Sequence, residues 1–102
     1  MKKTIEGKRY DTDTAECIAK FSKGNYNDFH HVCEQLYQTK KGEWFIHGEG
    51  GAMSGYAESD GNLSSGGEAI FTVTEEEAFE WLQKHDHNDA IDTHFADWIT
   101  EA

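Results

Sequence analysis

The sequence predicts an α+β protein: a small antiparallel sheet with a short N-terminal helix and two C-terminal helices packed on one face. Runs in which apolar and polar residues alternate, as in half-buried strands, lie mainly before Thr74, and apolar residues at helical spacing follow it. The 102 residues, 13% of them aromatic, provide the length and the apolar area for one domain that spans residues 1–102. We therefore expect one core, formed by a sheet and the helices that follow it.

The N-terminal segment predicts a strand followed by a helix. The strand is expected over residues 3–10, interrupted by a turn at Gly7. The helix is expected from Thr14 to Phe21, because Asp13 and Glu16 have the spacing of a capping box. Its apolar face would consist of Ala15, Ile18 and Ala19.

The central segment predicts a β-hairpin. Apolar and polar residues alternate from Phe29 to Thr39, residues 40–42 form a turn, and residues 43–47 return with side chains that favour strands. In this register Tyr37 faces Phe45, so residues of like parity share a face. The core face would hold Val32, Leu36, Trp44 and Ile46. The opposite face would hold Phe29, His31, Cys33, Gln35, Tyr37, Phe45, His47 and Glu49.

Two loop regions and one further strand complete the expected sheet. Residues 22–28 are polar and predict a loop. The glycine-rich segment 48–67 predicts a second loop region, with a turn at residues 60–62. Residues 68–73 then predict a strand.

The C-terminal segment predicts two helices. Thr74 and Glu77 form a capping box for the first, which should end near His85. Residues 86–88 would cap the second helix. Its apolar residues fall at i, i+4, i+7 and i+8, namely Ile91, Phe95, Trp98 and Ile99. Three aromatic residues are expected to pack the helices on the sheet: Trp81, Phe95 and Trp98.

The net charge excludes two classes of function. Nine Lys and Arg residues stand against 20 Asp and Glu residues, for a formal charge of −11. Such a surface repels phosphate backbones and anionic lipids, so neither direct nucleic-acid binding nor a basic membrane anchor is expected. Residues 1–9 lack the apolar run of a signal peptide, and two cysteines are too few for a disulfide framework. We therefore expect a cytoplasmic protein.

Carboxylates are concentrated at the C-terminal end. Residues 75–102 contain nine Asp and Glu residues and one basic residue, Lys84. Carboxylates three or four residues apart on a helix lie about 5–6 Å from each other and repel, which a binding role would explain. The alternative is a solvated face whose first-turn carboxylates complement the helix dipole. We expect the following residues to bind a partner: Glu76, Glu77, Glu80, Asp86, Asp89, Asp92 and Asp97.

Histidine and cysteine side chains are expected on the face of the hairpin opposite its core. The register places His31, Cys33 and His47 there, and imidazole and thiolate suit zinc. Their spacing matches no zinc signature, and a fourth ligand, such as Glu49, would be needed. The alternative is ordinary surface histidines beside a buried thiol.

The sequence gives little support for catalysis. No Gly-Lys-Ser or Gly-Lys-Thr follows the glycines of residues 48–51, as a phosphate loop would require. A Cys33 nucleophile with a histidine base lacks the flanking patterns of known enzymes. The histidines near the helix ends are expected to be caps or packed imidazoles: His85, His87 and His94. We therefore expect no enzymatic activity, and no cofactor other than the zinc considered above.

Three segments of the chain are similar to segments of a known family: Thr4–Ala15, Leu36–Gly51 and Glu75–Trp81. Together they resemble a family of small acidic proteins carried by phages and mobile elements of Gram-positive bacteria, which includes anti-CRISPR proteins against type II effector nucleases. Ala52 departs from the family pattern, in which proline would follow the paired glycines. The shared motifs are structural, so the resemblance carries over no site residues.

The resemblance and the charge lead to the same expected function. The resemblance implies an anti-CRISPR protein that acts in a bacterial host cell on a type II CRISPR effector nuclease. Such nucleases hold nucleic acid in basic channels, where an acidic surface could bind and block DNA loading or cleavage. The alternatives are a metal-binding accessory protein that uses zinc, and a host-takeover protein of a mobile element with an unrelated protein partner.

Overall fold

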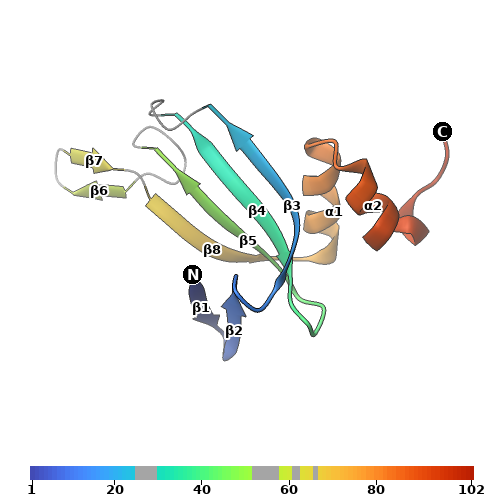
Figure 1. Cartoon of the computed structure of the whole chain (residues 1–102), viewed down its shortest axis with the longest axis horizontal. Coiled ribbons are helices and arrows are strands. Elements are labelled where there is room, and N and C mark those ends of the chain that lie inside the picture. The colour runs from blue at the N-terminus through green and yellow to red at the C-terminus, as the bar shows by residue number, and fades with distance from the viewer. Residues whose placement is uncertain (25–29, 52–57, 61–62, 66) are drawn as a thin grey trace.

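A four-stranded antiparallel sheet forms the centre of the molecule, and helices follow its last strand (Figure 1). The structure, a computed structural model, describes residues 1–24, 30–51, 58–60, 63–65 and 67–102. The sheet has the order β3-β4-β5-β8, in which β3 is Glu16–Lys23, β4 is Val32–Gln38, β5 is Trp44–Gly50 and β8 is Gly67–Val73. Two short hairpins flank it: β1 (Lys2–Ile5) with β2 (Lys8–Asp11), and β6 (Glu58–Asp60) with β7 (Leu63–Ser65). The helices are α1 (Glu75–Lys84), α2 (Asn88–His94) and a 3-10 turn, η1 (Ala96–Trp98). The predicted α+β class is confirmed, although strands dominate the chain.

The main core cluster lies between the sheet and the helices. Trp44 of β5 stacks on Phe95 at the end of α2, with ring centroids 5.3 Å apart. The stripe of α1 that faces the sheet consists of residues three and four apart, which lie on one side of a helix. The buried members of this cluster are Leu36, Trp44, Ile46, Ala78, Trp81, Leu82, Ile91 and Phe95.

A second core cluster lies on the opposite face of the sheet. Tyr37 and Phe45 are direct cross-strand partners, as the sequence predicts, and their rings stack 5.1 Å apart. Tyr10 of β2 meets Phe45 edge-on at 5.5 Å, and Ile70 of β8 completes the buried cluster. The β1–β2 hairpin therefore packs on part of the face that the register places opposite the main core. The expectation of one core is wrong, because the described residues form two buried clusters, one on each face of the sheet.

The turn of the first hairpin follows from its backbone conformation. Glu6 and Gly7 both have positive φ, 50° and 79°. Two successive residues in this region form the type of turn that matches the twist of paired strands. The predicted turn at Gly7 is confirmed, and it divides the expected strand into β1 and β2.

The predicted helix from Thr14 to Phe21 is wrong, because the chain from Glu16 to Lys23 forms strand β3. The backbone N–H of Asp13 donates to Oδ1 of Asp11 at 2.9 Å, so Asp11 closes a turn where the helix was expected to begin. Strand β3 pairs with β4 from Glu16 to Lys23, with one shift of register between Cys17 and Ala19. An isolated helix of this length is marginal, so the ladder with β4 decides the conformation.

A β-bulge explains why this segment looks helical in the sequence. The register with β4 shifts between Cys17 and Ala19, and both Ile18 and Ala19 pack against the main core. Two neighbouring apolar side chains on one side of a strand break the alternation expected of strands. Together with Ala15, Ile18 and Ala19 stand at positions i, i+3 and i+4, which is also the spacing of one face of a helix.

The start of α1 agrees with the sequence. The Glu77 N–H donates to Thr74 Oγ1 at 3.1 Å, and the Thr74 N–H donates to Glu77 Oε1 at 3.0 Å. These two bonds form the predicted capping box. The helix ends at Lys84, next to the expected His85.

The link from α1 to α2 is a backbone motif rather than a side-chain cap. The Asp86 N–H donates to the carbonyl of Gln83 at 3.2 Å, and the His87 N–H donates to that of Leu82 at 2.9 Å. Asp86 has φ 58°, as expected at the left-handed position of a Schellman motif. No side chain caps α2, so the predicted cap at residues 86–88 is wrong.

The last predicted helix is shorter than its apolar pattern. Helix α2 ends at His94, and Phe95 leaves the helical region with φ −130°. Ile91 and Phe95 are buried as predicted. Trp98 and Ile99 are each 42% exposed, so the expectation that Trp98 packs in the core is wrong.

Several expected features lie partly outside the described residues. These are the polar loop beyond Gly24, the start of the hairpin at Phe29, and the turn at Gly61 and Asn62. Within the described part, several residues of the predicted loops belong to strands instead: residues 22–23 to β3, 48–50 to β5, 58–60 to β6, 63–65 to β7 and Gly67 to β8.

Candidate acidic interface

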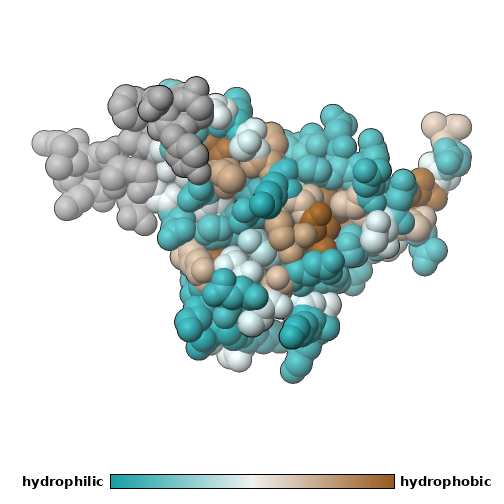
Figure 2. Space-filling model, in the orientation of Figure 1, coloured by the Kyte–Doolittle hydropathy of each residue, from teal (hydrophilic) through white to brown (hydrophobic). Residues whose placement is uncertain are grey.

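The carboxylates predicted to bind a partner all lie at one end of the molecule, which we call the helical end and define as residues 75–102. All seven side chains are exposed. In the space-filling view, hydrophilic surface covers much of this end, with apolar atoms between (Figure 2). The carboxylates lie on α1 (Glu76, Glu77, Glu80), on the turn after it (Asp86), on α2 (Asp89, Asp92) and on η1 (Asp97).

The three glutamates of α1 do not have the same role. Glu76 and Glu80 stand one turn apart on the side of α1 away from its buried stripe. The carboxylate of Glu77 accepts the Thr74 N–H, and Glu77 lines a hollow with Lys8 and Tyr10 on the β1–β2 side. The structure therefore separates Glu77, which stabilises the helix start, from Glu76 and Glu80.

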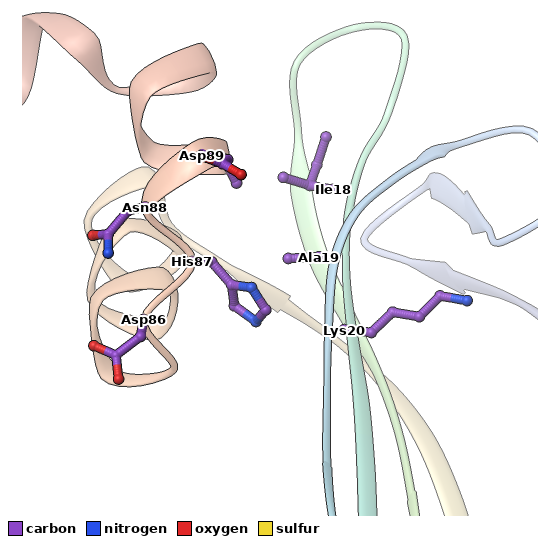
Figure 3. Close-up of a pocket in the computed structure, with 8 residues that line it drawn as sticks. Ile18, Ala19, Lys20, Asp86, His87, Asn88 and Asp89 are labelled. Atoms are coloured by element: carbon purple, nitrogen blue, oxygen red, sulfur yellow. The ribbon is translucent and has the colours of Figure 1, made fainter.

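Asp86 and Asp89 lie beside strand β3. With residues of β3 they line a hollow of about 470 Å³. Figure 3 shows the His87 ring directed towards Ala19, whereas the Lys20 side chain points away from the helices. Lys20 therefore does not neutralise the charge of Asp86 or Asp89 across this hollow.

Asp92 and Asp97 accompany the exposed apolar residues of the C-terminal segment. Asp92 lines a groove of about 400 Å³ together with Phe79, Trp98 and Ile99. Asp97 directly precedes Trp98 in the chain. The groove therefore combines apolar side chains with polar ones, and Asp92 is the carboxylate among the residues that line it.

Among the residues that the structure describes, no ion pair neutralises the seven carboxylates of the helical end. The described residues form the ion pairs Lys8–Glu43, at 2.8 Å, and His47–Glu68, at 3.0 Å, neither of which involves the seven carboxylates. Eight of the nine Lys and Arg residues lie in positions 1–41, and the ninth is Lys84. The carboxylates of the helical end therefore meet water and any approaching partner.

Aromatic and histidine side chains of the helical end form a cluster with strand β3. His85 stacks on Phe21 of β3, with ring centroids 3.8 Å apart, and meets Trp81 edge-on at 4.7 Å. Trp81 Nε1 donates to Glu34 Oε1 at 3.2 Å. Burial lowers the pKa of His85, so its imidazole is neutral at neutral pH. The predicted packing role of His85 is confirmed, but the sequence does not indicate its partner Phe21, because the spacing of residues 14–21 predicts a helix there.

His87 packs in the same cluster. Its ring lies parallel to that of Trp81, 5.5 Å away. Its Nε2 atom is buried and has no hydrogen-bond partner among the described residues. The ring therefore provides packing rather than a polar contact.

The residues predicted to hold zinc lie on one face but do not form a ligand set. The register places Cys33 opposite Glu49 and His47 opposite Gln35, and His31 directly precedes β4. His47 Nε2 lies 3.0 Å from Glu68 Oε2, and its Nδ1 lies 3.5 Å from Gln35 Oε1. Within the described residues, no three His, Cys, Asp or Glu side chains are close enough to hold a metal ion.

Cys33 is in a poor environment for a nucleophile or a metal ligand. Burial, followed by the charge of Glu49, raises the pKa of its thiol. The reactive and metal-binding form of cysteine is the thiolate, which this environment disfavours. Cys33 therefore behaves as a half-buried, protonated thiol.

Comparisons with known proteins add no family. No protein-family model matches the chain, and no curated protein or solved structure is similar to it. Among the described residues, no helix has the length and apolar character needed to cross a membrane. The geometry of the helical end therefore carries the functional argument.

Proposed function

We propose that the protein inhibits a type II CRISPR effector nuclease by binding it through the carboxylates of the helical end, thereby blocking DNA loading or cleavage. The observation that carries this proposal is the set of exposed carboxylates that form no ion pair with the described residues. The family resemblance of the sequence gives the class of partner.

The electrostatics favour a basic partner. An RNA-guided nuclease holds nucleic acid in positively charged channels that recognise backbone and shape. Carboxylates spaced by helical turns provide a similar density of negative charge on a rigid support. Charge complementarity of this kind speeds association and selects the partner, and it weakens as salt is added.

A pair of matched charge reversals tests the proposal. Glu80→Lys with Asp92→Lys changes the helical end, whereas Asp13→Lys with Glu16→Lys changes exposed carboxylates near the start of β3. Both variants have the same net charge, so only the position of the change differs. Loading of target DNA by the nuclease and its cleavage are measured with each variant.

The proposal predicts that reversal at the helical end abolishes most inhibition, while the control variant inhibits like the wild type. The inhibition by the wild type should also decrease steeply with salt. Equal loss from both variants, with circular dichroism showing intact folding, would exclude the helical end as the binding surface. No inhibition by the wild-type protein at low salt would exclude the function itself.

A further inference from the structure

The groove at the helical end, introduced above with Asp92, differs from the rest of the acidic surface. Apolar and polar side chains from α1, α2, the end of η1 and the two residues after it line this groove. Trp98 and Ile99 are each 42% exposed, although their neighbour Phe95 is almost fully buried. The residues that line it are Phe79, Gln83, Asn88, Ile91, Asp92, Trp98, Ile99 and Thr100.

Aromatic contacts with the core hold the side chains of the groove in place. Phe79 packs against Phe95 at 5.2 Å and against Trp98 at 5.3 Å, and Phe95 meets Trp98 edge-on at 5.1 Å. One side of Trp98 is therefore fixed on the core while the other side is open. Tryptophans held in this way are the side chains that most often dominate binding energy at protein interfaces.

The charges at the groove determine what it can accept. Asp92 lies in its wall, and Asp97 directly precedes Trp98 in the chain. Glu76 and Glu80 are exposed on α1, the helix that contributes Phe79 to the groove. None of these four carboxylates forms an ion pair with the described residues. An acidic segment would be repelled, and a neutral one would leave the carboxylates uncompensated.

A second copy of this chain is a poor occupant. The formal charge of −11 opposes self-association, and an interface of two such helical ends would bring like charges together. A segment that carries both cations and an apolar side chain contacts the apolar residues of the groove and also neutralises the carboxylates near it.

We infer that the groove between Phe79, Ile91 and the Trp98–Ile99 pair is a docking site for a basic protein segment that inserts an apolar side chain flanked by Lys or Arg. The inference rests on the proposed function, because it assigns to the partner of the helical end the chemistry of its contact segment. It also provides the apolar contacts that a purely electrostatic interface lacks.

Peptide binding to the protein alone tests this site independently of any nuclease. The probe is a peptide of about 15 residues made of Lys and Leu, with Leu on one helical face and no aromatic residue. A peptide of the same composition with scrambled Leu positions is the control, and a second control replaces Lys by Glu. Tryptophan fluorescence reports docking, because Trp98 is exposed whereas Trp44 and Trp81 are buried.

The amphipathic basic peptide should shift the fluorescence of the wild type to shorter wavelength and bind it best by calorimetry. Trp98→Ala should weaken binding by about tenfold or more, as expected for an interface anchor. Ile99→Ser provides a second change at the groove, in case loss of the Trp98 ring disturbs folding. Phe71→Ala is the matched control, because Phe71 is 39% exposed on β8 and does not line the groove, so its effect should remain within about twofold.

Equal binding of the ordered and scrambled peptides would overturn the inference, because charge alone would then explain the affinity. Binding of the acidic peptide, or self-association that Trp98→Ala abolishes, would also overturn it and assign the groove to another occupant. Absence of peptide binding together with charge-dependent inhibition of the nuclease would reject the groove and leave the proposed function intact.

Discussion

Replacing Phe95 with alanine is expected to destabilise the protein more than any other single change at the helical end. Phe95 is 2% exposed and lies where α2 ends. Its ring contacts Trp44 of the sheet at 5.3 Å, Phe79 of α1 at 5.2 Å and Trp98 at 5.1 Å. One side chain thus joins the sheet to both helices and to the C-terminal segment.

The size of the effect follows from the burial of the ring. Truncation of a buried phenylalanine to alanine costs about 3–5 kcal/mol, because the transfer free energy is lost and a cavity remains. The total stability of a domain of this size is about 5–15 kcal/mol. Each kcal/mol shifts Tm by about 4–8 °C, so we expect Tm to fall by about 12–40 °C.

Thermal and urea unfolding followed by circular dichroism measure this change, with Trp98→Ala as the comparison. Trp98 is 42% exposed and contacts the core with one side only, so its removal should lower Tm by less than half as much. If Phe95→Ala melts within a few degrees of the wild type, the C-terminal segment does not contribute to the core, and the assignment of the groove loses its structural support.

Two further predictions concern the link between α1 and α2. Asp86→Gly should raise stability by up to about 1 kcal/mol in urea unfolding, because Asp86 has φ 58° and glycine adopts this conformation without strain. Asp86→Asn, which also tolerates it, should remain close to the wild type; a less stable Asp86→Gly would contradict this account. Burial lowers the pKa of His85 below 6.5, so the unfolded chain binds the proton more tightly and stability should fall as pH drops through about 6.5. His85→Phe, which keeps a ring on Phe21, should lose less stability than the wild type over the same pH range, and an equal loss would show that other groups cause it.

The parts of the fold that the sequence predicts well are those set by local chemistry. The capping box of Thr74 and Glu77, the turn at Gly7 and the pairing of Tyr37 with Phe45 each depend on residues close in the chain. These signals act over a few residues and are visible without knowledge of the tertiary structure.

The parts that the sequence predicts poorly depend on distant partners. Strand β3 forms because β4 offers it a complete ladder, and the bulge after Cys17 hides its alternation. The early end of α2 follows from Phe95, whose ring is held among residues of α1 and β5. Spacing along the chain cannot show that the backbone leaves the helix at Phe95 and places Trp98 outside the helical pattern.

The candidate site shows the same division. Composition alone identifies the acidic C-terminal end, because nine carboxylates and one lysine in residues 75–102 need no structure to be noticed. The role of each carboxylate needs the structure, since Glu77 caps α1 while Asp92 lines the groove. The Trp98–Ile99 surface was hidden because the helical pattern assigned both residues to the core.

Three kinds of feature that lower the stability of the free protein occur together at its helical end. Asp86 occupies a left-handed position that favours glycine, and Trp98 and Ile99 remain half exposed. The seven carboxylates form no ion pair with the residues that the structure describes. A merely solvated face would explain Glu77, which stabilises the start of α1, but it would not explain exposed apolar side chains among like charges. Natural proteins retain such local conflicts mainly where function requires them. A basic partner with an apolar contact would relieve the charge repulsion and the apolar exposure together, which is why we place the interface at the helical end rather than on the polar face around His47.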